Sequence, residues 1–178
     1  MNPLWKRIET SVIVGGVGLL ALGMVSYEAG ARVNTTRSIP VGLYWASSKP
    51  VEKGDYVFFC PPQMVIFDMA KERGYITSGF CPGNFGYMMK RVLAVKNDAV
   101  TVASEGVHVN GTLLPLSAVR EVDKGGRPLG GYEPNSYTLG DSEVLLMSDV
   151  SSLSFDGRYF GPINRSQIKT VILPVITW

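Results

Sequence analysis

The feature that most constrains this chain is an uncharged apolar run from Thr10 to Tyr27 near its N-terminus. Lys6 and Arg7 precede the run and Glu28 ends it. Eighteen residues in a helix span roughly 27 Å, close to the thickness of about 30 Å of a membrane hydrocarbon core. Positive charge before such a run places the N-terminus in the cytoplasm and the rest of the chain outside. The run therefore predicts a membrane-targeting helix.

Two fates of this segment remain open. Ala29-Gly30-Ala31 has the small-x-small pattern at which secretory signals are cleaved. However, the run is long for the apolar core of a cleaved signal, so we expect a retained single-span anchor, with cleavage after Ala31 as the alternative. The predicted organisation is an anchor or signal segment over residues 1–31 and a domain over residues 32–178 in a periplasm-like compartment.

Composition limits the chemistry that this domain can perform. The chain has 17 Lys and Arg against 15 Asp and Glu, a net charge of +2 that is too balanced to indicate nucleic-acid binding. One histidine, His108, and two cysteines cannot build a four-ligand zinc site, and we expect no metal or cofactor. Because an extracytoplasmic compartment permits disulfides, Cys60 and Cys81 are predicted to pair, with two buried free thiols as the alternative.

The domain itself has the pattern of a mostly β fold. Short runs of β-branched and aromatic residues, bounded by Gly, Asp, Asn and Pro, predict strands. These strands are expected over Val41–Ala46, Asp55–Phe59, Met88–Val95, Ala99–Val102, Glu143–Met147 and Thr170–Leu173.

Three further segments complete the predicted fold. Asn110-Gly111 favours a type I′ hairpin over Val107–Leu114. One short helix is expected over Met64–Arg73, stopped by Gly74, and a surface loop over Lys124–Pro134. The prediction is a small, mostly antiparallel barrel or paired-sheet domain attached to one membrane helix.

Three segments of the domain carry candidate chemistry. Ser38 precedes Ile39-Pro40, which predicts a turn leading into a strand. Lys90 is embedded in the apolar run Met88–Val95, where apolar neighbours lower the pKa of an amine and make it able to take a proton from a serine hydroxyl. A solvent-facing Lys-Arg pair is the alternative for Lys90. Asp156 and Arg158 are spaced for a bidentate ion pair.

In this order after an N-terminal apolar run, these segments resemble the type I signal peptidases, which are membrane-bound serine/lysine endopeptidases. Ser38-Ile39-Pro40 is similar to that family's nucleophile box and Asp55–Phe59 to its next strand. Lys90–Val95 is similar to its lysine box, and Ser148–Gly161 to its last box. The resemblance implies the same β-rich fold for most of the extracytoplasmic chain.

The resemblance also implies a role for each site residue. Ser38 would be the nucleophile and Lys90 the general base, with Ser154 as a hydroxyl that orients the lysine. Asp156 and Arg158 would form a supporting ion pair. The family places an oxyanion-hole hydroxyl two residues before the nucleophile, at Thr36 in this chain, beside the backbone N–H of Ser38.

Departures from the housekeeping members of the family point to its conjugative-transfer branch. Pro40 lies two residues after the serine instead of three, the last box ends Asp156-Gly157-Arg158, and the chain is short with one apolar span. That branch implies a pilin precursor as substrate, trimmed at its C-terminus and joined head to tail through an acyl-enzyme. The implied partners are the bacterial inner membrane and other conjugative-transfer proteins. A housekeeping signal peptidase and a non-catalytic assembly component of the transfer apparatus remain alternatives.

Overall fold

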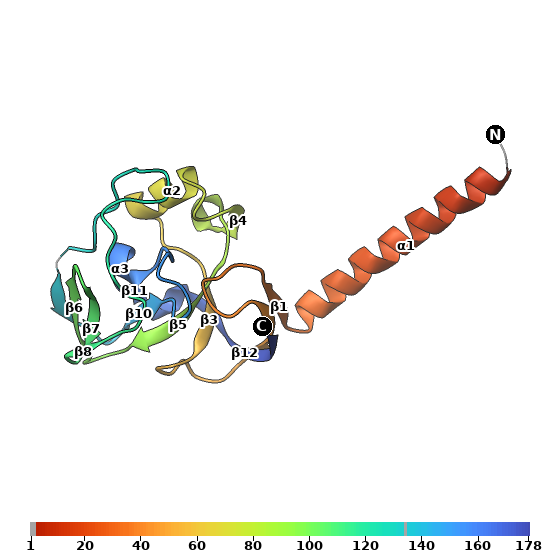
Figure 1. Ribbon diagram of the computed structural model, residues 1–178. Helices are drawn as coiled ribbons and strands as arrows, with labels where there is room; N and C mark the ends of the chain where they lie inside the picture. The colour runs from red at the N-terminus through yellow and green to blue at the C-terminus, as the bar shows by residue number, and fades with distance from the viewer. Residues whose placement is uncertain (1–2, 134) are drawn as a thin grey trace.

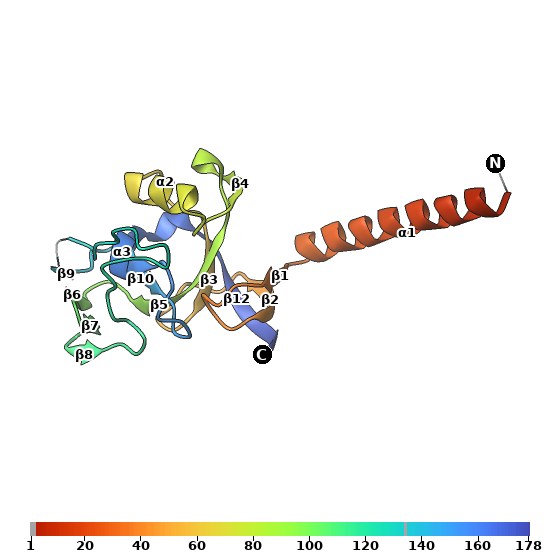
Figure 2. The same ribbon diagram turned by 45° about the horizontal axis from the view of Figure 1, so that its top comes forward.

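The computed structural model describes residues 3–133 and 135–178, so Met1, Asn2 and Pro134, the last residue of the expected surface loop, lie outside the described residues. Helix α1 (Pro3–Glu28) projects from the rest of the chain as a separate rod, as Figures 1 and 2 show. Its large apolar side chains from Ile8 to Tyr27 are exposed, and the segment Arg7–Glu28 is long and apolar enough to cross a membrane. This helix fits a membrane anchor or a signal sequence.

The rest of the described chain forms two antiparallel sheets. In spatial order the seven-stranded sheet of the described residues consists of β1 (Ala31–Asn34), β2 (Gly42–Ser47), β12 (Ile168–Thr177), β3 (Tyr56–Phe59), β5 (Met88–Ala94), β10 (Glu143–Met147) and β11 (Ile163–Asn164). The four-stranded sheet in the same part of the chain consists of β8 (Thr112–Leu113), β7 (Gly106–Val109), β6 (Ala99–Ala103) and β9 (Ser136–Thr138). The predicted mostly antiparallel β domain with one N-terminal apolar helix is therefore confirmed.

Short helices and one further strand lie in sequence between strands of the seven-stranded sheet. They are α2 (Val65–Glu72), β4 (Ser78–Cys81), α3 (Gly157–Phe160) and the 3-10 turns Pro82–Asn84 and Arg165–Gln167. The four-stranded sheet lies at the end of the domain away from α1 (Figure 2).

The predicted hairpin and helix are present close to their expected bounds. Asn110 and Gly111 both have positive φ, 51° and 77°, as a type I′ turn between β7 and β8 requires. Helix α2 ends at the C-cap Arg73, directly before Gly74 with φ of 76°. Helix α3 and strands β1, β4, β9 and β11 were not predicted, because these short segments have neither a run of β-branched and aromatic residues, as β3 has, nor a hairpin turn like the one between β7 and β8.

Strand β12 is longer than the predicted Thr170–Leu173 because it lies between two partners. It pairs with β3 along its first half and with β2 along the rest, with an irregularity between Pro174 and Ile176. At its far end it passes so close to Gly42 that a Cβ there would lie 2.1 Å from the Ile176 carbonyl oxygen. Gly42 therefore lets β12 close against the start of β2.

The larger core lies between the seven-stranded sheet and α2. Phe67 of α2 is fully buried and contacts the rings of Phe155 and Phe160. Cys60 and Cys81, on the two sides of α2 in sequence, are joined by a disulfide with Cα atoms 5.5 Å apart, which confirms the predicted bridge. The bridge closes a loop around the helix that covers this core.

Candidate active site

Ser38 lies in the turn that joins β1 to β2, and its neighbours hold this turn to the sheet. The Ile39 side chain is fully buried in a small core with Tyr44 and Phe58. The Tyr44 hydroxyl donates a hydrogen bond of 2.6 Å to the Pro40 carbonyl oxygen. The residues after Ser38 thus anchor the turn, while Ser38 itself stays partly exposed.

Asn34, at the end of β1, holds the same turn from inside. Its buried side-chain N–H groups donate to the carbonyl oxygens of Thr36, Ile39 and Pro40 over 2.7, 2.9 and 3.0 Å. Its Oδ1 accepts from the backbone N–H and the hydroxyl of Thr36 over 3.1 and 3.0 Å. One amide side chain therefore connects the residues before and after Ser38.

The hydroxyl groups of Thr36 and Ser38 lie 2.7 Å apart. A hydroxyl has one hydrogen to donate, and Asn34 Oδ1 can only accept. Thr36 therefore donates to Asn34, and the Ser38 hydroxyl donates to Thr36. For Ser38 to be deprotonated by another group, its hydroxyl must turn away from Thr36.

Lys90 occupies a core-facing position of β5. Strand alternation places it on the same face as the buried residues Val92 and Ala94. Only 3% of Lys90 is exposed. Burial disfavours the charged amine and is the main reason why the pKa of Lys90 is lowered from 10.5 to about 8; within this net change Asp156 raises the pKa and Arg158 lowers it.

The lowered pKa gives Lys90 a neutral form that an ordinary lysine lacks. At pH 7, roughly one in ten amines with such a pKa is neutral, against about one in three thousand with the usual value. The neutral amine is the form that can accept a proton. The Nζ of Lys90 donates a hydrogen bond of 2.6 Å to Ser154 Oγ, which fixes the direction of the amine.

Asp156 and Arg158, whose charges both act on this amine, form a fully buried, bidentate ion pair with Nε–Oδ1 and Nη2–Oδ2 distances of 2.8 and 3.0 Å. The backbone N–H of Ser148 also donates to Asp156. Arg158 Nη1 donates to the carbonyl oxygens of Leu116, Ala118 and Ser152. The ion pair thus holds together the end of β10, the Ser154 loop and a distant loop.

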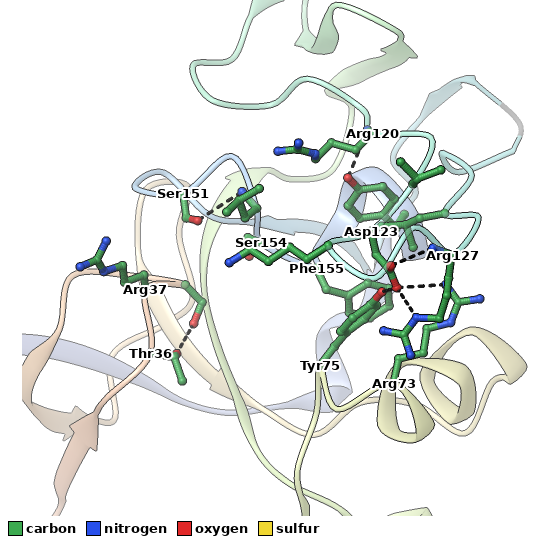
Figure 3. A pocket seen from close by; sticks show the side chains of 16 residues that line it. Thr36, Arg37, Arg73, Tyr75, Arg120, Asp123, Arg127, Ser151, Ser154 and Phe155 are labelled. Atoms are coloured by element: carbon green, nitrogen blue, oxygen red, sulfur yellow. Dashed lines mark hydrogen bonds and ion pairs between the residues drawn. The ribbon is translucent and has the colours of Figure 1, made fainter.

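A cavity of about 480 Å³ brings these elements to one surface. Thr36, Ser38 and Ser154 all line it, and Figure 3 shows Thr36 at one side and Ser154 nearer the centre. Among the residues that the structure describes, no hydrogen bond joins Ser38 to Lys90; each is bonded to its own hydroxyl partner, Thr36 or Ser154. The structure thus holds the serine and the lysine as two separate hydrogen-bonded pairs at one cavity.

Sequence reasoning did not identify Asn34. Its signal was present, because Asn directly before a turn commonly binds nearby backbone groups through its side chain. No local sequence pattern indicated the cationic side of the cavity, which Arg73 and Arg127 form in part. These residues come from segments that meet only in the folded domain.

The chain belongs to the signal peptidase family. The model of that family, described as signal peptidase, peptidase S26, matches residues 5–176, which confirms the resemblance drawn from the motifs. The plasmid transfer protein TraF of Escherichia coli is 71% identical over 178 residues, which cover 100% of both chains. The conjugal transfer protein TraF of Agrobacterium fabrum is 37% identical over 171 residues, 93% of each chain. A solved signal peptidase I of Enterococcus faecalis V583 is 18% identical, with a TM-score of 0.41, over 70% of this chain and 98% of that one.

Proposed function

We propose that this chain is a membrane-anchored serine endopeptidase that processes a pilin precursor in plasmid conjugation, with Ser38 as nucleophile and Lys90 as general base. The observation that carries the proposal is the buried Lys90, with a lowered pKa and a bond to Ser154 at the cavity that Ser38 lines. The names of the relatives support conjugation as the setting. The active domain would face the periplasm, with α1 in the inner membrane.

The proposed first step is acylation. Neutral Lys90 takes the proton of the Ser38 hydroxyl as Oγ attacks the substrate carbonyl carbon. The Ser38 backbone N–H and the Thr36 hydroxyl would stabilise the oxyanion. To donate to it, the Thr36 hydroxyl must first break its hydrogen bond to Asn34. The lysine then gives its proton to the departing amine, so the peptide C–N bond breaks and a Ser38 ester remains.

The ester can be resolved by two nucleophiles. Water would release a linear, trimmed pilin. The amino terminus of the same pilin, held close to the ester, would instead form a peptide bond and a closed ring, because a well-oriented intramolecular group can reach an effective molarity above about 10⁵ M. In both cases Lys90 accepts the proton of the incoming group, and Ser38 recovers its own.

Mass spectrometry of a pilin precursor co-expressed with this protein tests the proposal. We expect wild-type protein to shorten the precursor, and a cyclised product to be lighter than the linear trimmed chain by one water. Ser38→Ala and Lys90→Ala should leave the precursor intact. Ser166→Ala and Lys169→Ala, at exposed positions outside the cavity, are matched controls that should process normally.

The same experiment decides between the alternatives. Processing by Ser38→Ala would overturn the catalytic proposal and favour an assembly role. An intact precursor with wild-type protein, together with growth of a signal-peptidase-depleted cell that expresses it, would identify a housekeeping signal peptidase instead.

A further inference from the structure

The cavity beside Ser38 has a strongly cationic lining. Five of its residues carry positive charge, and one carries negative charge: Arg37, Arg73, Arg120, Lys124 and Arg127 against Asp123. In Figure 3 Arg37 lies on the same side as Thr36, while Arg73, Arg127 and Asp123 form a cluster on the opposite side. The excess is local, because the whole chain carries a net charge of only +2.

The negative charge of Asp123 is already engaged. Its carboxylate accepts from the Tyr75 hydroxyl, from Arg127 Nε at 2.7 Å and from the backbone N–H groups of Gly125 and Arg127. The Tyr75 hydrogen bond, foremost among these contacts, holds the pKa of Asp123 well below its usual range. Arg73 lies 3.6 Å from the same carboxylate. Asp123 thus remains ionised and is held by Arg73 and Arg127, although its single charge offsets only one of theirs.

The other three cations have no acidic partner among the described residues. Arg37, Arg120 and Lys124 are exposed at the cavity, and the hydrogen bond at Arg120 is made by its backbone N–H to the Tyr159 hydroxyl. The guanidinium of Arg120 and the amine of Lys124 are therefore free to bind an anion. Guanidinium groups bind carboxylates with two parallel hydrogen bonds, which gives directional recognition.

The remaining lining of the cavity is suited to a peptide. Leu129, Leu153 and Phe155 contribute apolar surface to the same lining as the cations and Ser38. Apolar walls with a few charged groups at fixed places are typical of sites that orient a ligand. A peptide that reaches Ser38 would place neighbouring residues against this surface.

We propose that Arg120 and Lys124 select substrates that carry a carboxylate close to the bond that Ser38 attacks. This inference rests on the proposed function, because Ser38 defines which bond is meant. The carboxylate has two sources: the side chain of Asp or Glu, or the free C-terminus of a substrate cut near its end. Both offer the same planar group to the cations.

Peptide binding to the full-length Ser38→Ala protein in uncharged detergent tests the inference without catalysis. Three fluorescent alanine-rich peptides of equal length are compared by anisotropy: one with Glu and an amidated end, one with Gln and an amidated end, and one with Gln and a free C-terminus. We expect one of the carboxylate peptides to bind about tenfold more tightly than the neutral peptide, and the preference to fall as salt rises. Which of the two binds identifies the source of the carboxylate.

Arg120→Gln and Lys124→Gln, made in the Ser38→Ala background, should each remove most of this preference. Both positions are exposed, so the substitutions leave the core intact. Lys169→Gln removes one exposed charge outside the cavity and should leave the preference unchanged. Equal binding of all three peptides, or an equal loss with Lys169→Gln, would overturn the inference. Processing of the precursor by Ser38→Ala would overturn the catalytic proposal alone and leave this binding result standing.

Discussion

The amine of Lys90 and the hydroxyl of Ser154 form a buried hydrogen bond of 2.6 Å, and Ser154 also lines the cavity that contains Ser38. Ser154 therefore lies between the proposed base and the space that a substrate would occupy. In the proposed mechanism its hydroxyl would set the direction of the amine without being consumed.

Removing this hydroxyl should slow precursor cleavage while the protein stays folded. We expect Ser154→Ala to lower kcat by about 10- to 100-fold with little change in KM, because the amine loses its orientation toward Ser38. Ser154→Thr keeps the hydroxyl and should retain more activity than Ser154→Ala. Equal activity of wild-type protein and Ser154→Ala in a precursor-cleavage assay would remove Ser154 from the mechanism.

Asn34 should matter both for stability and for activity. Asn34→Asp keeps the size of the side chain but turns an acceptor toward the carbonyl oxygens of Thr36, Ile39 and Pro40. Leaving buried groups unpaired costs about 1–3 kcal/mol, so we expect a loss of that size in the free energy of unfolding. The cleavage rate should fall by more than the loss of folded protein explains, because the turn that positions Ser38 is released.

Denaturant unfolding and cleavage of the same Asn34→Asp sample measure the two effects. Thr36→Val provides the comparison, because it removes the hydroxyl beside Ser38 and leaves the three Asn34 donor bonds in place. An Asn34→Asp protein with unchanged stability and activity would show that this amide does not hold the turn.

The strands and the motif residues of the candidate site could be predicted from sequence, whereas most of the cavity lining could not. Ser38, Lys90, Asp156 and Arg158 stand in short segments whose order and spacing resemble those of a known family, so local sequence was enough to single them out. Tyr75 and Asp123 are 48 residues apart in sequence, so they come into contact only in the folded chain. Contacts of this kind leave no local pattern, which is why the cationic lining of the cavity was not predicted.

The burial of Lys90 also depends on the fold and not on the local sequence alone. An apolar run was a reason to expect a lowered pKa, but the alternation of β5 between buried and partly exposed positions decides which side chain faces the core. Lys90 faces inward, whereas its neighbour Arg91 bonds to Asp149 with a distance of 2.8 Å. A shift of one residue in register would have exchanged the two.

Stability should depend on pH through Lys90. Its pKa is about 8 in the folded chain and 10.5 as an ordinary lysine, so the unfolded chain binds more protons between these values and stability rises with pH there. Lys90→Met removes this dependence. Its stability relative to wild type should therefore fall by roughly 2–3 kcal/mol between about pH 7 and pH 10.

Denaturant unfolding of both full-length proteins in uncharged detergent checks this difference, and groups other than Lys90 cancel in the comparison. Parallel pH dependences of the wild-type and Lys90→Met proteins would mean that Lys90 keeps an ordinary pKa in the folded chain.

The central claim is that neutral Lys90 activates Ser38, and the pH dependence of precursor cleavage tests it most directly. We expect kcat/KM to rise about tenfold per pH unit below pH 8 and to level off above it, because deprotonation of the lysine creates the active form. Lys90→Arg should be inactive at every pH, because a guanidinium does not release its proton in this range. A rate that is independent of pH from about pH 6 to pH 10, or a Lys90→Ala protein with the wild-type rate and profile, would contradict the account.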